Sequence, residues 1–259
     1  MKIILFILFV LYSINIIAQD TIPPLVTDRP DQAESASVVP WKYLQIETGF
    51  LKQNDRTDNS VNRSFAYNTT LFRYGLLKNL EFRLGVDYLG NEIKTVSTGD
   101  VNKFSGLSPV YTGFKIKIGN EKCLMPSLAF LAGIIMPFTA GSYYKTESTA
   151  ADMKFAFANT LTDHLSVGYN VGVMWDGDTT IPDYHYSVSF GINLSGRWDA
   201  FLESYGYFPG KGKNEHLADA GLTWKLLPNL QFDISGGIGL NKPSPDNFIG
   251  VGLTCRIPR

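Results

Sequence analysis

The sequence predicts an all-β protein, an antiparallel transmembrane β-barrel of about twelve strands. Three observations predict it. Apolar and polar residues alternate with a period of two along most of the chain, the alternating segments are mostly about 10–13 residues long, and short turns alternate with longer polar loops. A period of two is the repeat of a strand with one apolar face. Strands of about 9–11 residues cross a bilayer when tilted, and the alternation of short turns with long loops is typical of outer-membrane barrels.

The composition narrows the possible classes of protein. The chain has 259 residues, with 23 Lys and Arg against 24 Asp and Glu, so its formal net charge is −1. Nucleic-acid binding needs a basic surface, so we expect no nucleic-acid partner. The two cysteines exclude a disulfide scaffold and a multi-cysteine metal site. The three isolated histidines do not make a metal site either, and we expect no metal and no cofactor.

The first 40 residues divide into two parts. Lys2 precedes a continuous apolar run over residues 3–11, and Ala18 is a small residue suited to cleavage. The apolar run is too short to span a membrane, so residues 1–18 are predicted to be a secretory signal peptide, with a membrane anchor as the alternative. Residues 19–40 are polar, carry Pro30 and show no alternation. We expect them to form a periplasmic or plug segment before a barrel over residues 41–259.

Twelve segments show the alternation. In residues 230–240, leucine, phenylalanine, isoleucine and one glycine stand at the even positions, and polar residues or glycine at the odd ones. The predicted strands are residues 41–52, 64–76, 80–90, 106–118, 125–137, 150–160, 164–175, 184–195, 198–208, 216–227, 230–240 and 247–257. Tight turns are expected at 77–79, 162–163, 196–197 and 228–229, and long exposed loops at 53–63, 91–105, 138–149, 176–183, 209–215 and 241–246. An even number of strands places both ends of the barrel sequence with the short turns, on the periplasmic side.

The alternation alone does not tell the inner face from the outer face. A soluble lipocalin-like barrel would turn its apolar face inward, whereas a membrane barrel turns it toward lipid. Aromatic residues on the apolar face gather near both ends of the strands, as at the two interfaces of a bilayer. These residues are Trp198, Trp224, Phe232 and Phe82 near the turns, and Tyr88, Trp175, Tyr184 and Phe138 near the loops. The strand length and these two belts favour the membrane barrel.

Charged residues on the polar face form the candidate site. Strand parity places one cluster on the lumen face near the periplasmic end, namely Glu47, Arg73, Glu81 and Arg83. Opposite charges on neighbouring strands can pair across the ladder, and a network that stiffens the wall is one interpretation. The other is that the N-terminal segment folds into the lumen and docks on this cluster as a plug or gate, through Asp28, Arg29, Asp31 or Glu34.

His185 and Ser187 lie two residues apart on one strand face. A His-x-Ser pair on a barrel strand resembles the arrangement in the outer-membrane phospholipase, which makes a barrel hydrolase one alternative function. A serine nucleophile needs a base within hydrogen-bond reach and a third group that orients the base. Parity turns both side chains into the lumen, away from lipid, and no orienting Asn or Asp is evident. These features favour a lumen lining over a catalytic pair.

Several strings resemble a known family. They are TDRPDQAES (27–35), QIETGF (45–50), LFRYGL (71–76), EFRLG (81–85), GLSPVYTGFKIKI (106–118) and ESYGYF (203–208). Together they resemble a bacterial family of outer-membrane transporters that is labelled as a meta-pathway of phenol degradation. The resemblance implies a β-barrel that takes up small hydrophobic or aromatic compounds. It carries over no catalytic residues.

These observations predict an outer-membrane channel or transporter for passive passage of small hydrophobic or aromatic molecules. Twelve strands fall between filled eight-stranded barrels and open porins, so we expect a narrow lumen. The expected partners are outer-membrane lipid, a small-molecule solute and the barrel-assembly machinery, in the cell outer membrane. A barrel hydrolase and a structural or adhesive barrel are the alternatives.

Overall fold

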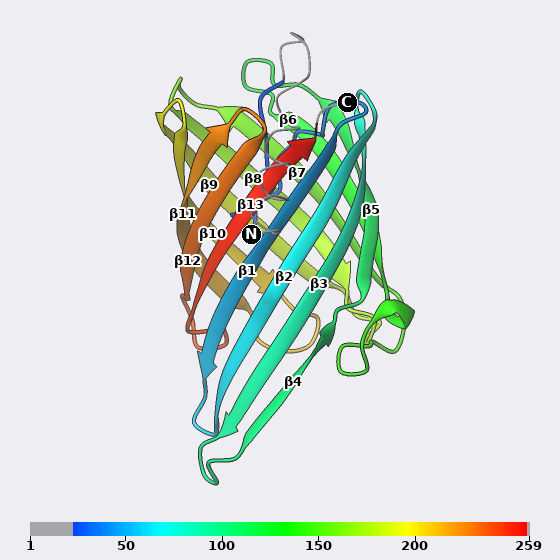
Figure 1. The fold of residues 1–259 in the computed structure, drawn as a ribbon, viewed down its shortest axis with the longest axis vertical. Helices are drawn as coiled ribbons and strands as arrows, with labels where there is room; N and C mark the ends of the chain where they lie inside the picture. Colours follow the sequence, from blue (N-terminus) through cyan, green and yellow to red (C-terminus); the bar gives the residue numbers. More distant parts are fainter. Residues whose placement is uncertain (1–22, 258–259) are drawn as a thin grey trace, which may run out of the picture.

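The computed structural model describes residues 23–257 as a closed antiparallel β-barrel with an extra strand at its rim (Figure 1). The predicted signal peptide lies outside the described residues. The strands are β1 (Leu44–Arg56), β2 (Ser60–Leu77), β3 (Leu80–Thr95), β4 (Val101–Leu107), β5 (Val110–Gly119), β6 (Ser127–Met136), β7 (Ala150–Thr160), β8 (Leu165–Trp175), β9 (Asp183–Ser195), β10 (Trp198–Phe208), β11 (Glu215–Leu227), β12 (Leu230–Gly239) and β13 (Asn247–Ile257).

Twelve of these strands make the ring, which confirms the predicted fold class. Each strand of the ring pairs with its neighbours in sequence, and β1 pairs with β13 from Leu44 opposite Ile257 to Asn54 opposite Asn247. Closure leaves no unpaired strand edge in the hydrocarbon layer, where unsatisfied backbone groups are costly. The start of β1 and the end of β13 lie beside the turn between β2 and β3, as predicted from the even strand number.

One predicted strand is in fact two. The structure divides the segment predicted at 106–118 into β4 and β5, with a break at Ser108 and Pro109, and both pieces pair with β3. Proline has no N–H to donate to a ladder, so it interrupts the strand. The Ser108 N–H still donates to the carbonyl oxygen of Asp87, at 2.9 Å. In the described chain β4 pairs with β3 alone and stands outside the ring.

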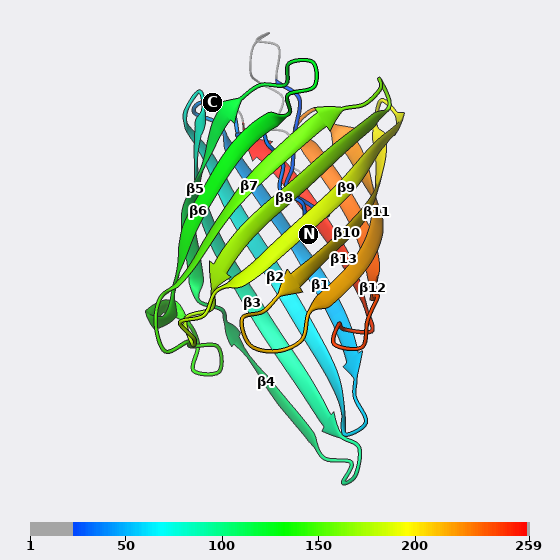
Figure 2. The ribbon, with the colours of Figure 1, turned by 180° about the vertical axis from the view of Figure 1, so that it is seen from behind.

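The prediction of loops at 53–63 and 91–105 was wrong, because strands β1 to β4 occupy most of these residues. They extend beyond the rest of the barrel as a narrow sheet (Figures 1 and 2). Ion pairs of Glu92 with Arg63 at 2.9 Å and with Lys103 at 2.7 Å join its strands. Outside the membrane both faces of a strand can be polar, so this extension shows no alternation in the sequence.

The two faces of the wall separate as predicted. The outer face is apolar, with exposed fractions of 58% for Leu202 and 57% for Ile238, and Trp198 stacks on Trp224 at 5.6 Å between ring centroids near the short turns. Buried polar and charged residues line the lumen, among them Gln45, Glu47, Arg73, Glu81, Arg83, Lys115, Glu203, Asp219, Gln231, Asp233 and Arg256. Among the described residues, no helix is long and apolar enough to cross a membrane.

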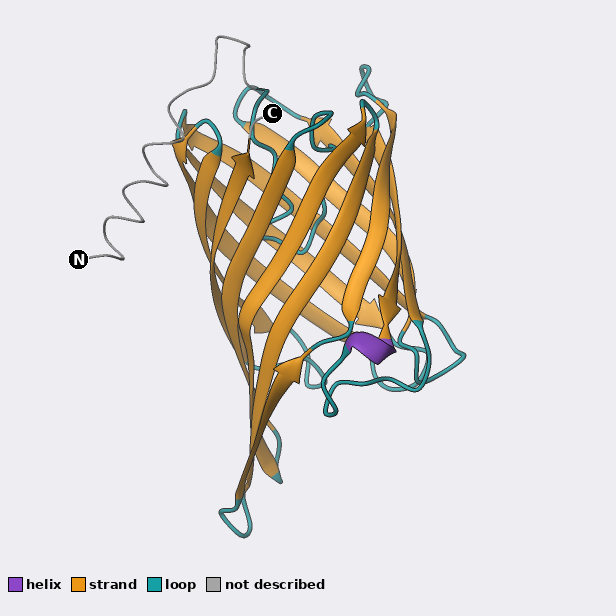
Figure 3. Cartoon of the chain, turned by 45° about the vertical axis from the view of Figure 1, so that its right-hand side comes forward, coloured by secondary structure: helices purple, strands orange, loops and turns teal. Residues whose placement is uncertain are grey.

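Residues 23–40 run inside the lumen at the end that carries the short turns (Figure 3). We call these residues the plug. They form no strand, and they bury the side chains of Leu25, Ala33, Ala36 and Val39. The plug joins the wall where the Lys42 N–H donates to the Gly75 carbonyl oxygen at 2.7 Å, just before β1 begins.

Candidate functional site

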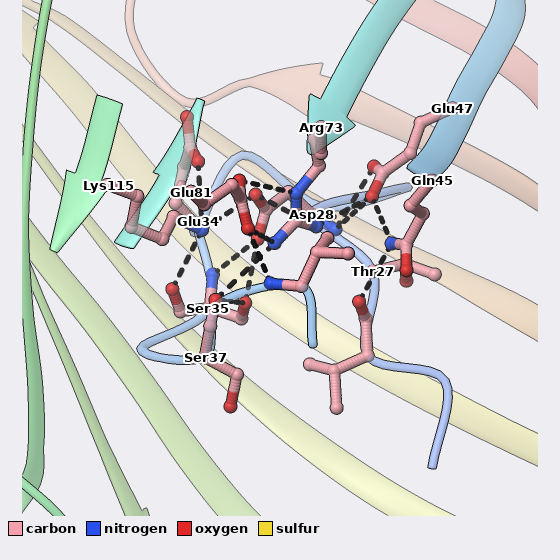
Figure 4. Close-up of polar contacts among 12 residues, drawn as sticks. Thr27, Asp28, Glu34, Ser35, Ser37, Gln45, Glu47, Arg73, Glu81 and Lys115 are labelled. Atoms are coloured by element: carbon pink, nitrogen blue, oxygen red, sulfur yellow. Dashed lines mark hydrogen bonds and ion pairs between the residues drawn. The ribbon is translucent and has the colours of Figure 1, made fainter. Parts of the chain in front are cut away.

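The plug docks on the lumen wall through Asp28 (Figure 4). One oxygen of the Asp28 carboxylate, Oδ2, lies 2.7 Å from Arg83 Nη1, 2.7 Å from Lys115 Nζ and 3.1 Å from Arg73 Nη1. Burial alone would raise the pKa of Asp28, but Arg73, Lys115 and Arg83 together hold it well below its usual range. The other oxygen, Oδ1, accepts hydrogen bonds from the backbone N–H and hydroxyl of Ser35. Asp28 is therefore ionised, and it binds the wall through one carboxylate oxygen and stabilises the conformation of the plug through the other.

The wall arranges its own charges around this centre. Arg73 Nη1 lies 2.7 Å from Glu47 Oε1, and Arg73 Nε lies 2.8 Å from Glu81 Oε1. Both carboxylates also receive the plug, because Glu47 accepts the Asp28 N–H at 3.1 Å and Glu81 accepts the Val39 N–H at 2.7 Å. The four wall residues of the predicted cluster are thus adjacent in space, and each contacts the plug or a residue that does.

Glu34 is the second carboxylate that the plug brings to the wall. It lies 2.7 Å from Arg83 Nη2, 3.5 Å from Lys115 Nζ and 3.6 Å from Lys154 Nζ. Its backbone is held by Asn170, whose side-chain oxygen accepts the Glu34 N–H at 2.6 Å and whose amide donates to the Glu34 carbonyl at 3.0 Å. Two exchanged hydrogen bonds fix the plug at this point as a strand partner would.

The charges of wall and plug complement each other. Around Asp28 and Glu34 the wall carries three carboxylates, Glu47, Glu81 and Asp152, against four cations, Arg73, Arg83, Lys115 and Lys154. The plug adds two carboxylates to this excess of one cation. A buried charge is tolerated when it is paired and hydrogen-bonded. Among the described residues, Lys115 has carboxylate partners on the plug alone, so the docked plug completes the ion pairs of the wall.

Arg29 and Asp31 contact other parts of the wall. Arg29 Nη2 lies 3.1 Å from Asp233 Oδ1 on β12. For Asp31, burial and the nearby Glu203 carboxylate raise the pKa to about 8. Glu203 accepts the next two backbone N–H groups of the plug, from Gln32 at 2.6 Å and Ala33 at 2.8 Å. Arg29 thus adds an ion pair to the docked plug, whereas Asp31 adds a carboxyl group that favours its protonated form.

Several anchors of the plug escaped the sequence analysis. Gln45 donates to the Val26 carbonyl at 2.9 Å, Gln231 donates to the Thr27 hydroxyl at 3.1 Å, and Arg256 donates to the carbonyls of Pro23 and Pro24. Lys115, Asn170, Glu203 and Asp233 were missed as well. All of them stand at lumen-facing positions of the alternation, which is the one signal in the sequence that could have selected them.

In the part of the chain that the structure describes, Gln32 at the tip of the plug lines three cavities of the lumen. The first, of about 430 Å³, lies against β1, β2 and β3 and is bordered by Arg83 and Tyr111. The second, of about 240 Å³, lies against β5 to β10. The third, of about 170 Å³, borders a small apolar cluster of Tyr205, Leu217 and Phe248. The lumen therefore holds space for small molecules next to the plug.

His185 and Ser187 both line the second cavity, so they face the lumen as parity predicts. The structure adds an acid near them, because Asp152 Oδ1 of β7 lies 3.8 Å from His185 Nε2, a distance too long for the hydrogen bond that would orient the histidine. Strand pairing across β7, β8 and β9 brings them together, which spacing in the sequence cannot show. Within residues 23–257, however, no hydrogen bond joins Ser187 Oγ to a base. The group lacks the contact that activates a serine nucleophile.

The closed ring with an apolar outer face and a polar lumen defines an outer-membrane β-barrel. The chain belongs to the family described as "Putative MetA-pathway of phenol degradation", which it matches over residues 27–257. The fold is also that of an outer membrane channel from Pseudomonas putida F1, with 10% sequence identity, a TM-score of 0.68 and coverage of 90% of this chain and 100% of the channel. The transport unit of the autotransporter AIDA-I from Escherichia coli has 7% identity, a TM-score of 0.52 and coverage of 92% of this chain and 94% of its own. No curated protein sequence matches this chain significantly.

Proposed function

We propose that this protein is an outer-membrane channel through which small hydrophobic or aromatic molecules pass passively, and that the plug constricts its periplasmic mouth. The observation that carries the proposal is the plug itself, a segment of the chain held in the lumen by ion pairs and hydrogen bonds, beside cavities that open around its tip. Such contacts can break and re-form without unfolding the wall, because β1 to β13 are paired to one another and not to the plug.

Two further findings support the proposal. The family to which the chain belongs is described by phenol degradation, whose substrates are small aromatic compounds. The structurally similar protein from Pseudomonas putida F1 is an outer membrane channel. The lumen of this chain combines aromatic side chains such as Tyr111, Tyr205 and Tyr207 with charged ones, which suits small solutes better than polypeptides.

Deletion of residues 22–36 tests both parts of the proposal. The purified full-length protein in planar bilayers should show small single-channel conductance, and the deletion variant should show a larger one, because the segment that carries Asp28 and Glu34 is gone. Heat-modifiable migration on gels verifies that the variant barrel is folded. Unchanged conductance in a folded deletion variant would contradict the constriction. Absence of conductance and of solute-driven liposome swelling in both proteins would contradict the channel and favour a structural barrel.

A further inference from the structure

The narrow sheet that β1 to β4 form beyond the rest of the barrel, here called the extension, carries its positive charges on one face (Figure 1). We propose that this face binds the phosphorylated headgroup of the glycolipid in the outer leaflet of the outer membrane. The inference goes beyond the proposed function, because it assigns a lipid to the outside of the wall and does not depend on what passes through the lumen.

Strand pairing gathers the charges of the extension on its outer face. Residues directly opposite each other in an antiparallel pair lie on the same face. On β3 the alternation runs without a bulge from the lipid-facing Phe82 to Lys94, so the even positions of the extension continue the outer face of the wall. The charged residues that the pairing places on this face are Lys52, Arg56, Arg63, Glu92, Lys94 and Lys103. Among the described strand residues of the extension, the opposite face carries Asp55 and no lysine or arginine.

Glu92 does not neutralise this face. It lies 2.9 Å from Arg63 and 2.7 Å from Lys103, and the exposed fractions of the side chains are 19% for Glu92, 48% for Arg63 and 68% for Lys103. The two cations therefore cover the carboxylate and carry the charge that faces outward. The cations of this face that form no ion pair within residues 23–257 are Lys52, Arg56 and Lys94. Five cations against one carboxylate make the outer face of the extension a basic patch.

An aromatic cluster places the basic patch at the surface of the bilayer. The ring of Tyr67 stacks on Phe65 at 5.4 Å between centroids and lies 6.2 Å from the ring of Tyr88. Exposed tyrosines on the outer face of a barrel mark the membrane interface. Lys52 pairs with Phe65 at this level, and Glu92 follows Tyr88 by four residues, which is about 10 Å higher on a tilted strand. The patch therefore extends from the aromatic level into the layer of lipid headgroups.

A phosphorylated lipid fits both parts of this surface. Lysine and arginine bind phosphate oxygens through charge-assisted hydrogen bonds. Neighbouring strands lie about 4.8 Å apart, and successive residues on one face lie about 7 Å apart along a strand, so one headgroup can contact several of the cations. A lipid also brings acyl chains to Phe65, Tyr67 and Tyr88, whereas a free anion leaves these rings without a partner. The chemistry of the surface thus favours a lipid phosphate over a phosphate in solution.

Native mass spectrometry of the purified full-length protein in detergent tests the site. The probes are diphosphorylated lipid A and the same lipid after treatment with phosphatase, and the phosphorylated form should bind with the lower half-saturation concentration. Each lysine or arginine near an anionic membrane surface strengthens binding roughly fivefold. The triple variant Lys52→Gln/Arg56→Gln/Lys94→Gln, which leaves the ion pairs of Glu92 intact, should therefore raise the half-saturation concentration roughly 10- to 100-fold.

The matched control is Lys78→Gln/Lys122→Gln/Arg197→Gln. It removes the same number of lysines and arginines at the short turns, at the opposite end of the barrel, and should leave the half-saturation concentration unchanged. Heat-modifiable migration on gels verifies that both variants are folded.

Weaker binding of diphosphorylated lipid A to the outer-face variant but not to the control supports the site. Equal binding to the two variants would overturn the inference, as would equal binding of the phosphorylated and dephosphorylated lipids to the wild type. Displacement of the lipid by inorganic phosphate would assign the patch to free anions, and stronger binding of a polyglutamate peptide would assign it to an acidic protein, so either result would also overturn it. None of these results alters the conductance measurement, so the proposed function stands or fails separately.

Discussion

Replacing Asp28 with asparagine should release the plug from the wall. Asparagine keeps the shape of the side chain but removes the charge that Arg73, Arg83 and Lys115 share at 2.7–3.1 Å. These groups are nearly inaccessible, with side-chain exposures of 0–3%. Removal of one partner from a buried charge pair costs about 3–5 kcal/mol. The equilibrium between docked and released plug should therefore shift toward release by roughly 10²- to 10⁴-fold.

Single-channel conductance at neutral pH measures this shift, since a released plug widens the lumen. We expect the Asp28→Asn protein to show conductance close to that of the barrel without residues 22–36. The matched control is Asp31→Asn, an identical chemical change three residues later. Asp31 favours its protonated form in the docked plug, so asparagine resembles its native state and docking should persist.

The result that would refute this reasoning is a folded, heat-modifiable Asp28→Asn barrel with wild-type conductance. It would mean that the backbone contacts to Asn170 and Glu203 hold the plug without the ion cluster. Equal release of the plug by Asp31→Asn and by Asp28→Asn would also refute it. Release would then not depend on the loss of the ion pairs with the three cations.

Three other predictions concern pH, chemistry and orientation. Burial and Glu203 raise the pKa of Asp31 from 3.8 to about 8, so between these pH values the docked plug binds a proton that the released plug has lost. Docking should therefore weaken, and conductance should rise, as the pH increases from about 4 to 8. Asp31→Asn should flatten this rise in conductance. The purified wild-type protein should not hydrolyse phospholipid. Hydrolysis that disappears in Ser187→Ala would contradict the proposed channel function and support a barrel hydrolase. In a Cys123→Ser background, a cysteine that replaces Asn59 should react with an impermeant thiol reagent on intact cells, and one that replaces Asn79 should not. The opposite labelling pattern would show that the barrel lies in the membrane in the opposite orientation.

The sequence predicted the wall well wherever lipid lies on one side. The predicted bounds of β7, β10 and β13 match the structure, because a strand between lipid and a polar lumen must alternate. The same rule fails beyond the membrane, where the extension of β2 and β3 carries polar residues on both faces. Pro109, inside a predicted strand, was a signal for the break between β4 and β5 that the count of alternating residues ignored.

The candidate site was less predictable for a geometric reason. Alternation tells which residues face the lumen, but the height of each residue along the barrel depends on strand tilt and stagger. Asp28 could be matched to a cluster of charges on the three strands that follow the plug in sequence. The other supports of the plug come from β8, β10 and β12, and Asp233 stands 204 residues from Arg29 in the chain. No local pattern links residues so distant.

The plug and the second cavity share charged groups, which couples their occupancy. Glu34 of the plug lies 3.6 Å from Lys154, which lies 3.7 Å from Asp152 in the cavity, and Gln32 of the plug lines the cavity directly. Release of the plug removes one wall of the cavity and one carboxylate from Lys154. A solute that binds the complete cavity more tightly must stabilise the docked plug by the same factor. A small aromatic solute that enters the second cavity should therefore bind more weakly to Asp28→Asn than to the wild type, although Asp28 does not line the cavity. Equal affinities, measured by ligand-observed NMR, would show that the cavity is complete without the plug.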